Sequence, residues 1–186
     1  MIKLYKININ EISAADYTRV YNLLADDLKQ KIDAKQNADD KKRSLAAFLL
    51  LFGGAKELYK RDDFEIKFNE NGKPICDFCH FNISHSGEWA VCVFSDTPIG
   101  VDIQQIKDIK MRGNYRFFTT REAEYVNSDT ALLPQRFTEI FTKKEAAVKM
   151  LGGSLASMAS RIDTFSPEYN FETLIHKKFI ITICKA

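Results

Sequence analysis

Two long segments with helical spacing, each accompanied by short strand-like segments, constrain the fold of this chain more than any other feature. Helices are expected over residues 39–59 and 133–151, and Gly152-Gly153 ends the second. Residues 45–52 are wholly apolar, which predicts a place at the centre of the core. Because similar elements occur twice in a similar order, we expect an α+β fold of two pseudo-symmetric α/β halves. These halves are residues 1–97 and 98–186, and the second is reduced at its end.

Shorter elements are expected around each long helix. Ser13 fits the N-cap of a helix that runs from Tyr17 to Leu28, and another helix is expected over residues 115–126. Asn71-Gly72 is a turn signal. Apolar alternation and short apolar runs predict strands over residues 1–7, 64–68, 89–94, 99–103, 161–165, 171–175 and 179–184.

Composition and charge narrow the class of protein. The chain has 186 residues, of which 45% are hydrophobic and 28% charged, as in ordinary soluble globular proteins. A net charge of +2 is too small to indicate nucleic-acid binding. No segment has the length of a membrane span, and the N-terminus lacks the apolar core of a signal peptide. We therefore expect a cytoplasmic protein without nucleic-acid or membrane partners, and with reduced cysteines.

A haem-attachment motif and the spacing of a redox cysteine pair both occur in the sequence Cys76-Asp77-Phe78-Cys79-His80. Covalent haem attachment would normally need export, and no export signal is present. A redox pair is expected at a helix start, whereas this pair follows a turn that leads into an extended segment. Two cysteines also supply only half of a four-ligand zinc site. Chance spacing is therefore the favoured interpretation.

The strand at residues 99–103 carries acidic and amide groups on one face. Alternation puts Gly100, Asp102 and Gln104 on the same side, with the last two roughly 7 Å apart. Both could reach one cation, and Mg²⁺ prefers oxygen ligands. The alternative is an edge strand with a solvated polar face, which this segment alone favours.

The second long helix shifts that balance. Lys144 falls on the apolar stripe of this helix. Its ammonium is either buried and functional, or it extends to the surface. Glu145 and Lys149 are four residues apart, which alone would be a weak surface ion pair. If Glu145 faces Asp102, two carboxylates and the Gln104 amide form a set that suits Mg²⁺ and a phosphate-bearing substrate.

Ser84-His85-Ser86 follows a segment that has the pattern of a buried strand. Two interpretations remain open: a local hydrogen-bonding turn, or a phosphate site with His85 and the Ser84 hydroxyl as donors. A serine-hydrolase triad does not fit, because the glycine-flanked nucleophile elbow is absent.

These segments together resemble the 4′-phosphopantetheinyl transferases of the surfactin-synthetase-activating (Sfp) type, over nearly the whole chain. The matching residues are Arg43, Gly72-Lys73-Pro74, Asn82-Ile83-Ser84-His85-Ser86, Gly100-Val101-Asp102, Phe117-Phe118-Thr119, and Lys144-Glu145-Ala146 with Lys149. The resemblance implies an active site between the two halves, with coenzyme A (CoA) and Mg²⁺ bound there. It implies transfer of the phosphopantetheine arm to a serine of an acyl or peptidyl carrier protein. The alternative is a non-catalytic CoA- or nucleotide-binding module of the same fold.

The resemblance also implies a role for each matching residue. Asp102, Glu145 and Gln104 would hold the metal, although Gln104 stands where many relatives have glutamate. Glu145 would also act as the general base. Lys149 would be the second catalytic residue, because it is suited to neutralising phosphate charge. The implied contacts to CoA or its phosphates are Arg43, Lys73, Pro74, Ser84, His85 and Lys144. We expect a monomer that meets an acidic carrier protein.

Overall fold

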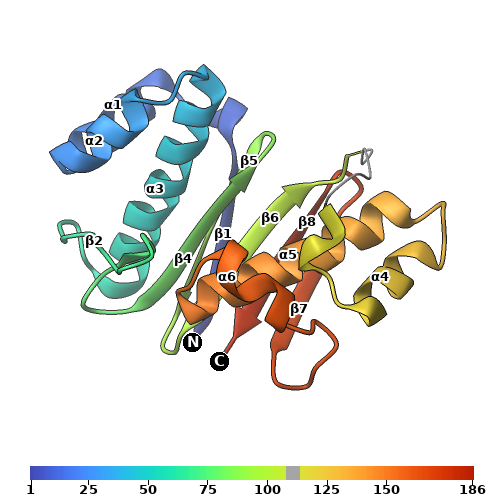
Figure 1. Cartoon of the computed structure of the whole chain (residues 1–186). Coiled ribbons are helices and arrows are strands. Elements are labelled where there is room, and N and C mark those ends of the chain that lie inside the picture. Colours follow the sequence, from blue (N-terminus) through green and yellow to red (C-terminus); the bar gives the residue numbers. More distant parts are fainter. Residues whose placement is uncertain (108–113) are drawn as a thin grey trace.

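Two three-stranded antiparallel sheets form the centre of the protein. The computed structural model describes residues 1–107 and 114–186. The first sheet has the order β1 (Ile2–Asn8), β5 (Trp89–Ser95), β4 (His80–Ser86), as Figure 1 shows. The second has the order β6 (Ile99–Gln105), β8 (Phe179–Lys185), β7 (Asn170–Ile175). In both sheets the first strand pairs with the last, and the last pairs with the one before it. A two-fold relation between the halves stays a prediction.

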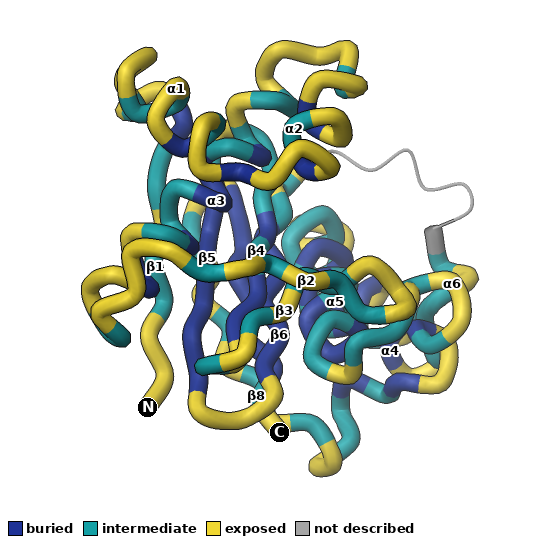
Figure 2. The backbone as a smooth tube through the Cα atoms, turned by 90° about the vertical axis from the view of Figure 1, so that its left-hand side faces the viewer, coloured by how far each residue is buried: buried dark blue, intermediate teal, exposed yellow. Residues whose placement is uncertain are grey.

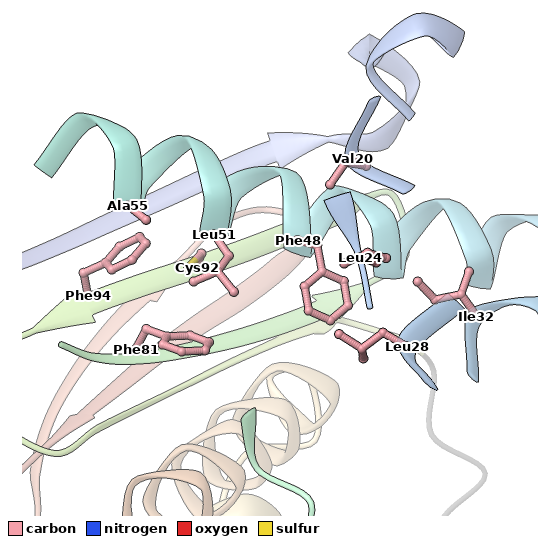
Figure 3. Packing of buried hydrophobic residues seen from close by; sticks show 10 residues of the cluster. All are labelled: Val20, Leu24, Leu28, Ile32, Phe48, Leu51, Ala55, Phe81, Cys92 and Phe94. Carbon is pink, nitrogen blue, oxygen red and sulfur yellow. The ribbon is translucent and has the colours of Figure 1, made fainter. Parts of the chain in front are cut away.

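A long helix packs against each sheet (Figure 1). Helix α3 (Ala38–Tyr59) packs against the first sheet, and α5 (Leu133–Leu151) packs against the second. Figure 3 shows Phe48 and Leu51 of α3 facing Phe81 and Cys92 of the strands. A separate buried cluster joins the two sheets, and it includes Val91, Val93, Val101, Ile181 and Ile183.

The remaining elements cover the ends of this arrangement. Helices α1 (Ala14–Leu23) and α2 (Asp26–Asp33) add Val20 and Leu28 to the buried cluster that includes Phe48 and Leu51, while their outer surfaces are exposed (Figure 2). No helix in residues 1–107 or 114–186 is long and apolar enough to cross a bilayer. The bounds of the remaining elements are η1 Ile9–Glu11, β2 Lys67–Phe68, β3 Pro74–Ile75, η2 Asn114–Phe117, α4 Thr120–Asn127, α6 Leu155–Met158 and η3 Ala159–Arg161.

Most of the expected elements are confirmed. The long helices start and end within one residue of the expected positions, and Gly152 ends α5 in the left-handed conformation with a φ of 74°. The Ser13 hydroxyl accepts from the Asp16 N–H, as expected of an N-cap. The expected strands over residues 1–7, 89–94, 99–103, 171–175 and 179–184 are all present.

Four expectations from the sequence were wrong. The helix through Tyr17–Leu28 is divided into α1 and α2, because Leu24 and Ala25 have extended backbones. The strand over residues 64–68 is reduced to β2, and Phe64 and Ile66 before it pack against the core. The helix over residues 115–126 is divided at the Thr119 N-cap. Residues 161–165 form no strand, since η3 ends at Arg161.

Polar side chains of β4 make a seam with β6. Asn82 Oδ1 accepts from the Val101 N–H at 2.9 Å, and Ser84 Oγ accepts from the Ile103 N–H at 3.4 Å. Ser86 Oγ accepts from the Gln105 N–H at 3.1 Å. Because these three residues alternate along β4, they satisfy every second N–H at the edge of β6. The seam joins the two sheets without a backbone ladder between them.

Gly100 lets α5 approach β6 closely. A Cβ atom at this position would lie 2.0 Å from the Ala146 carbonyl oxygen and 2.5 Å from the Met150 backbone nitrogen. Both atoms belong to the α5 backbone, which cannot move aside as a flexible side chain could. The buried hydroxyls of Thr142 on α5 and Thr182 on β8 add a 2.9 Å hydrogen bond to the same interface. The helix is therefore held directly over the polar face of β6.

We predict that Gly100→Ala lowers the free energy of unfolding by about 1–3 kcal/mol or more, because the methyl group overlaps helix backbone. Gly53→Ala is the control. Gly53 is an exposed residue inside α3, and no atom lies within 4 Å of the place that an added methyl group would take. Alanine there should stabilise the protein by about 0.5–1 kcal/mol. Urea unfolding of both variants tests this, and equal effects would contradict the close packing.

Candidate active site

A cavity of about 300 Å³ lies where the seam meets the two long helices. Its wall includes residues of α3, β4, β6 and α5. The side chains there that could bind a ligand or take part in a reaction are Ser84, His85, Asp102, Gln104, Glu145 and Lys149. The structure therefore brings together six of the side chains that the sequence singled out. A larger cavity of about 610 Å³ beside β3 contains Lys73 but none of these six.

Asp102 is the central side chain of this cavity, and it is 1% exposed. Its Oδ1 accepts from Lys149 Nζ at 2.6 Å and from Ser84 Oγ at 2.8 Å. Its Oδ2 accepts from Gln104 Nε2 at 3.2 Å. A buried carboxylate needs such partners, because an unpaired charge is costly away from water. The expected polar face of Gly100, Asp102 and Gln104 exists, and α5 covers it.

Glu145 lies one helical turn before Lys149 and is partly buried. Burial raises the pKa of its carboxyl group, and the negative charge of Asp102 adds to the effect. Within residues 1–107 and 114–186 the Glu145 carboxylate has no hydrogen-bonding partner, although the ammonium of Lys149 acts on it electrostatically. It therefore has oxygen atoms to offer a ligand.

This donor set fits a hard cation. Two neighbouring carboxylates and the Gln104 amide oxygen are ligands that Mg²⁺ accepts, and Mg²⁺ commonly keeps several waters. The described part of the chain has no cluster of three or more histidine, cysteine or acidic side chains placed for a metal. The site could hold Mg²⁺ through Asp102, Glu145 and Gln104.

Positive charge gathers beside His85. Burial lowers the pKa of His85, and the cations of Lys35, Arg43 and Lys149 lower it further. The guanidinium of Arg43 donates to the Gly87 carbonyl at 2.8 Å and pairs with Asp40. Arg43 in turn holds the pKa of Asp40 below its usual value. An anion here would meet several cationic groups, which also favour its binding.

Sequence reasoning did not single out Lys35 as a site residue. The signal for it was the concentration of basic residues between positions 29 and 43. That concentration also fits a solvated helix face, so it could not identify Lys35 by itself. The electrostatic effect of Lys35 on His85 is what relates it to the cavity.

Ser84 is buried, and its hydroxyl group is already engaged. It donates to Asp102, and it accepts from Lys149 Nζ at 3.1 Å and from the Ile103 N–H. These bonds hold Asp102 and Lys149 in place at the seam. Ser84 lines the cavity in this arrangement, and its contact with CoA stays a prediction.

Lys73 and Pro74 lie apart from Asp102, in and beside strand β3. Lys73 Nζ donates to the Ile99 carbonyl at 3.2 Å, and burial lowers its pKa. Lys73 lines the larger cavity together with Gly152, at the C-terminal end of α5. The structure therefore does not bring these two residues into the cavity with the carboxylates.

Lys144 also points away from the cavity that contains Asp102 and Glu145, which we call the carboxylate cavity. It is fully buried, and its Nζ pairs with Glu122 at 2.7 Å and donates to the carbonyls of Ala159 at 2.9 Å and Ile162 at 2.5 Å. Sequence reasoning missed Glu122. Its signal was the spacing Thr119-x-x-Glu122, which the structure confirms as a capping box.

Comparison with known proteins agrees with this geometry. Residues 98–182 match the model of the 4′-phosphopantetheinyl transferase superfamily. The 4′-phosphopantetheinyl transferase Sfp of Bacillus subtilis (strain 168) is 30% identical over 172 residues, which cover 89% of this chain and 75% of the relative. The 4′-phosphopantetheinyl transferase gsp of Aneurinibacillus migulanus is 32% identical over 184 residues, 96% of this chain and 76% of the relative.

The chain belongs to the 4′-phosphopantetheinyl transferase superfamily. The match to both relatives runs through the two halves, so it includes α3 and β4 as well as β6 and α5. The 4′-phosphopantetheinyl transferase AcpT of Escherichia coli (strain K12) is also similar, with 31% identity over 134 residues, 64% of this chain and 65% of the relative. The carboxylate cavity thus lies in a phosphopantetheinyl transferase fold, between its two long helices.

We predict that Lys144→Met costs about 3–5 kcal/mol of unfolding free energy, because it leaves the Glu122 carboxylate buried without its cation. The double variant Lys144→Met with Glu122→Gln should lose less than the two single changes add up to, by about 0.5–3 kcal/mol. Urea unfolding measures this coupling. A stable Lys144→Met protein with weakened CoA binding would contradict the structural role.

Proposed function

We propose that the protein transfers the 4′-phosphopantetheine arm of CoA to a serine of an acyl or peptidyl carrier protein, in a reaction that depends on Mg²⁺. The observation that most strongly supports this proposal is the pair of carboxylates, Asp102 and Glu145, in one cavity with Lys149. The cationic groups around His85 support the same function, since CoA carries phosphates. We further propose that it acts as a monomer in the cytoplasm, as the sequence predicts.

Binding of the nucleotide would use the cationic side of the cavity. His85, Arg43 and Lys35 are suited to the 3′-phosphate of CoA, because their charges already act on one another. A phosphate would favour the protonated form of His85, which burial and the neighbouring cations disfavour in the free protein. The side chains of Lys73 and Pro74, beside the other cavity, would extend the contacts toward the rest of the nucleotide.

The metal would be held by Asp102, Glu145 and the Gln104 amide oxygen. Mg²⁺ bound there would stabilise the negative charge that develops on the pyrophosphate oxygens. In the ligand-free protein the Lys149 ammonium balances the Asp102 carboxylate. Lys149 is then in place to neutralise a phosphate oxygen beside the same carboxylate. Lys149 would therefore pair with Asp102 and, when CoA binds, also neutralise a phosphate oxygen.

Glu145 is suited to accept the proton of the carrier serine. Burial and Asp102 raise its pKa, so its carboxylate binds a proton more readily than an exposed glutamate does. Its lack of hydrogen-bonding partners in the described part of the chain leaves it accessible to a hydroxyl group or to a bridging water. Deprotonation makes the serine oxygen nucleophilic, so that it would bond to the phosphorus that carries the pantetheine arm. The pyrophosphate P–O bond would break, and adenosine 3′,5′-bisphosphate would be the leaving group.

The direct test is intact-mass spectrometry of apo carrier proteins incubated with CoA, Mg²⁺ and the protein. We predict that Asp102→Asn lowers the transfer rate by about 100-fold or more, because one metal ligand and the partner of Lys149 are lost. Glu172→Gln, on the partly exposed strand β7, is the matched control and should retain the full rate. CoA binding without transfer by the unaltered protein would instead favour the non-catalytic binding module.

A second prediction concerns the 3′-phosphate. His85→Ala should weaken CoA binding about ten- to a hundredfold, because a hydrogen bond to a charged group contributes about 1.5–3 kcal/mol. Binding of 3′-dephospho-CoA, which lacks that group, should change little. Calorimetry with both ligands measures the difference, and equal losses would contradict this assignment.

A third prediction concerns Gln104. An amide oxygen carries no net charge and is a weaker ligand for a hard cation than a carboxylate. Gln104→Glu should therefore lower the Mg²⁺ concentration that gives half-maximal activity. Titration of Mg²⁺ at saturating CoA, with the unaltered protein as the reference, decides this. Superimposable curves would remove Gln104 from the metal site.

A further inference from the structure

Two cysteines outside the carboxylate cavity form a close pair. Cys76 and Cys79 lie in the loop between β3 and β4, and their sulfur atoms are 3.6 Å apart. Both are partly buried and line the cavity of about 610 Å³. The sequence favoured chance spacing, because the pair lacks the helix start of the usual redox motif. The loop nevertheless brings the two sulfur atoms into contact.

We propose that Cys76 and Cys79 are a reversible dithiol site that closes to a disulfide by exchange with low-molecular-weight disulfides. The proposal is independent of the transferase function. It rests on the sulfur contact, on access through the cavity, and on the different chemistry of the two thiols.

The two thiols have complementary roles. The hydrogen bond from Cys79 lowers the pKa of Cys76 to about 6. The same shared hydrogen bond raises the pKa of Cys79. Cys76 is therefore the thiol that ionises more readily and supplies the attacking thiolate in exchange, while Cys79 holds its proton more tightly.

The exchange has two balanced steps. The Cys76 thiolate attacks one sulfur of a small disulfide, forms a mixed disulfide and releases one small thiolate. Cys79 then loses its proton, attacks the Cys76 sulfur and releases the second small thiolate. The protein dithiol is oxidised to a disulfide, and the small disulfide is reduced to two thiols.

The other two cysteines are unsuited to thiol–disulfide exchange. Cys92 is fully buried between α3 and the first sheet, and burial raises the pKa of its thiol well above the usual value. Cys184 is fully buried beside Met150, and burial raises the pKa of its thiol to about 12. Both thiols remain protonated at neutral pH, so the reaction belongs to the loop pair.

A disulfide between Cys76 and Cys79 should change the structure near the β2–β3 hairpin. The same cavity wall contains Lys73, on the hairpin that leads into β3. A bond between Cys76 and Cys79 must draw their sulfur atoms closer than 3.6 Å, so the loop has to adjust. The oxidised and reduced proteins should therefore differ in hydrogen exchange at the β2–β3 hairpin.

The test is oxidation of the whole native protein in glutathione buffers of graded ratio, followed by acid quenching, alkylation and mass spectrometry. We expect a single reversible transition in which one Cys76–Cys79 disulfide forms. Cys184→Ala should leave this transition unchanged. Two free thiols at every ratio, glutathione adducts without ring closure, or a bond that involves Cys92 would each overturn the proposal.

Single variants test the assigned order of attack. In Cys79→Ser the remaining Cys76 should accumulate as a stable mixed disulfide with glutathione. In Cys76→Ser the remaining Cys79 should react more slowly at neutral pH than Cys76 does, because burial still disfavours the Cys79 thiolate after the effect of Cys76 is gone. Equal rates in the two variants would overturn the assigned roles. Alkylation of the unaltered protein, with the first modified cysteine identified by peptide mapping, gives the same comparison without a substitution.

Discussion

The close approach of helix α5 to strand β6 is the constraint on which the site depends. Gly100 has no side chain, so the α5 backbone lies directly on the strand. Two residues further along β6, Asp102 faces the same helix and meets Lys149. Glu145, one turn earlier on α5, is then close enough for the Asp102 charge to act on it. A larger residue at position 100 would move Asp102 away from Glu145 and Lys149 on α5.

The seam between β4 and β6 is the second requirement, because it holds the edge of β6 against the first half. Asn82, Ser84 and Ser86 satisfy backbone N–H groups of β6, and Ser84 also binds the carboxylate of Asp102. One short segment therefore joins the halves and positions a site residue. The buried charge of Asp102 is tolerated because it is hydrogen-bonded and paired with Lys149, as Lys144 is paired with Glu122.

Sequence periodicity predicted the long helices and the polar face of β6, because both follow from local spacing. It could not decide between roles that depend on contacts distant in sequence. The apolar stripe that contains Lys144 is visible in the sequence, but the pairing of its ammonium with Glu122 is visible only in the structure. Ser84 suited a phosphate donor, because nothing in the sequence shows that β4 lies along β6. Cys76 and Cys79 required the loop conformation before their contact could be recognised.

The most direct measurement is a crystal structure of the protein with CoA and Mn²⁺ in place of Mg²⁺, using anomalous scattering to locate the metal. This account predicts a metal peak bound by Asp102 and Glu145, with the pyrophosphate of CoA beside Lys149. A metal peak away from these two carboxylates would contradict it. A CoA pyrophosphate outside the cavity between α3 and α5 would do the same.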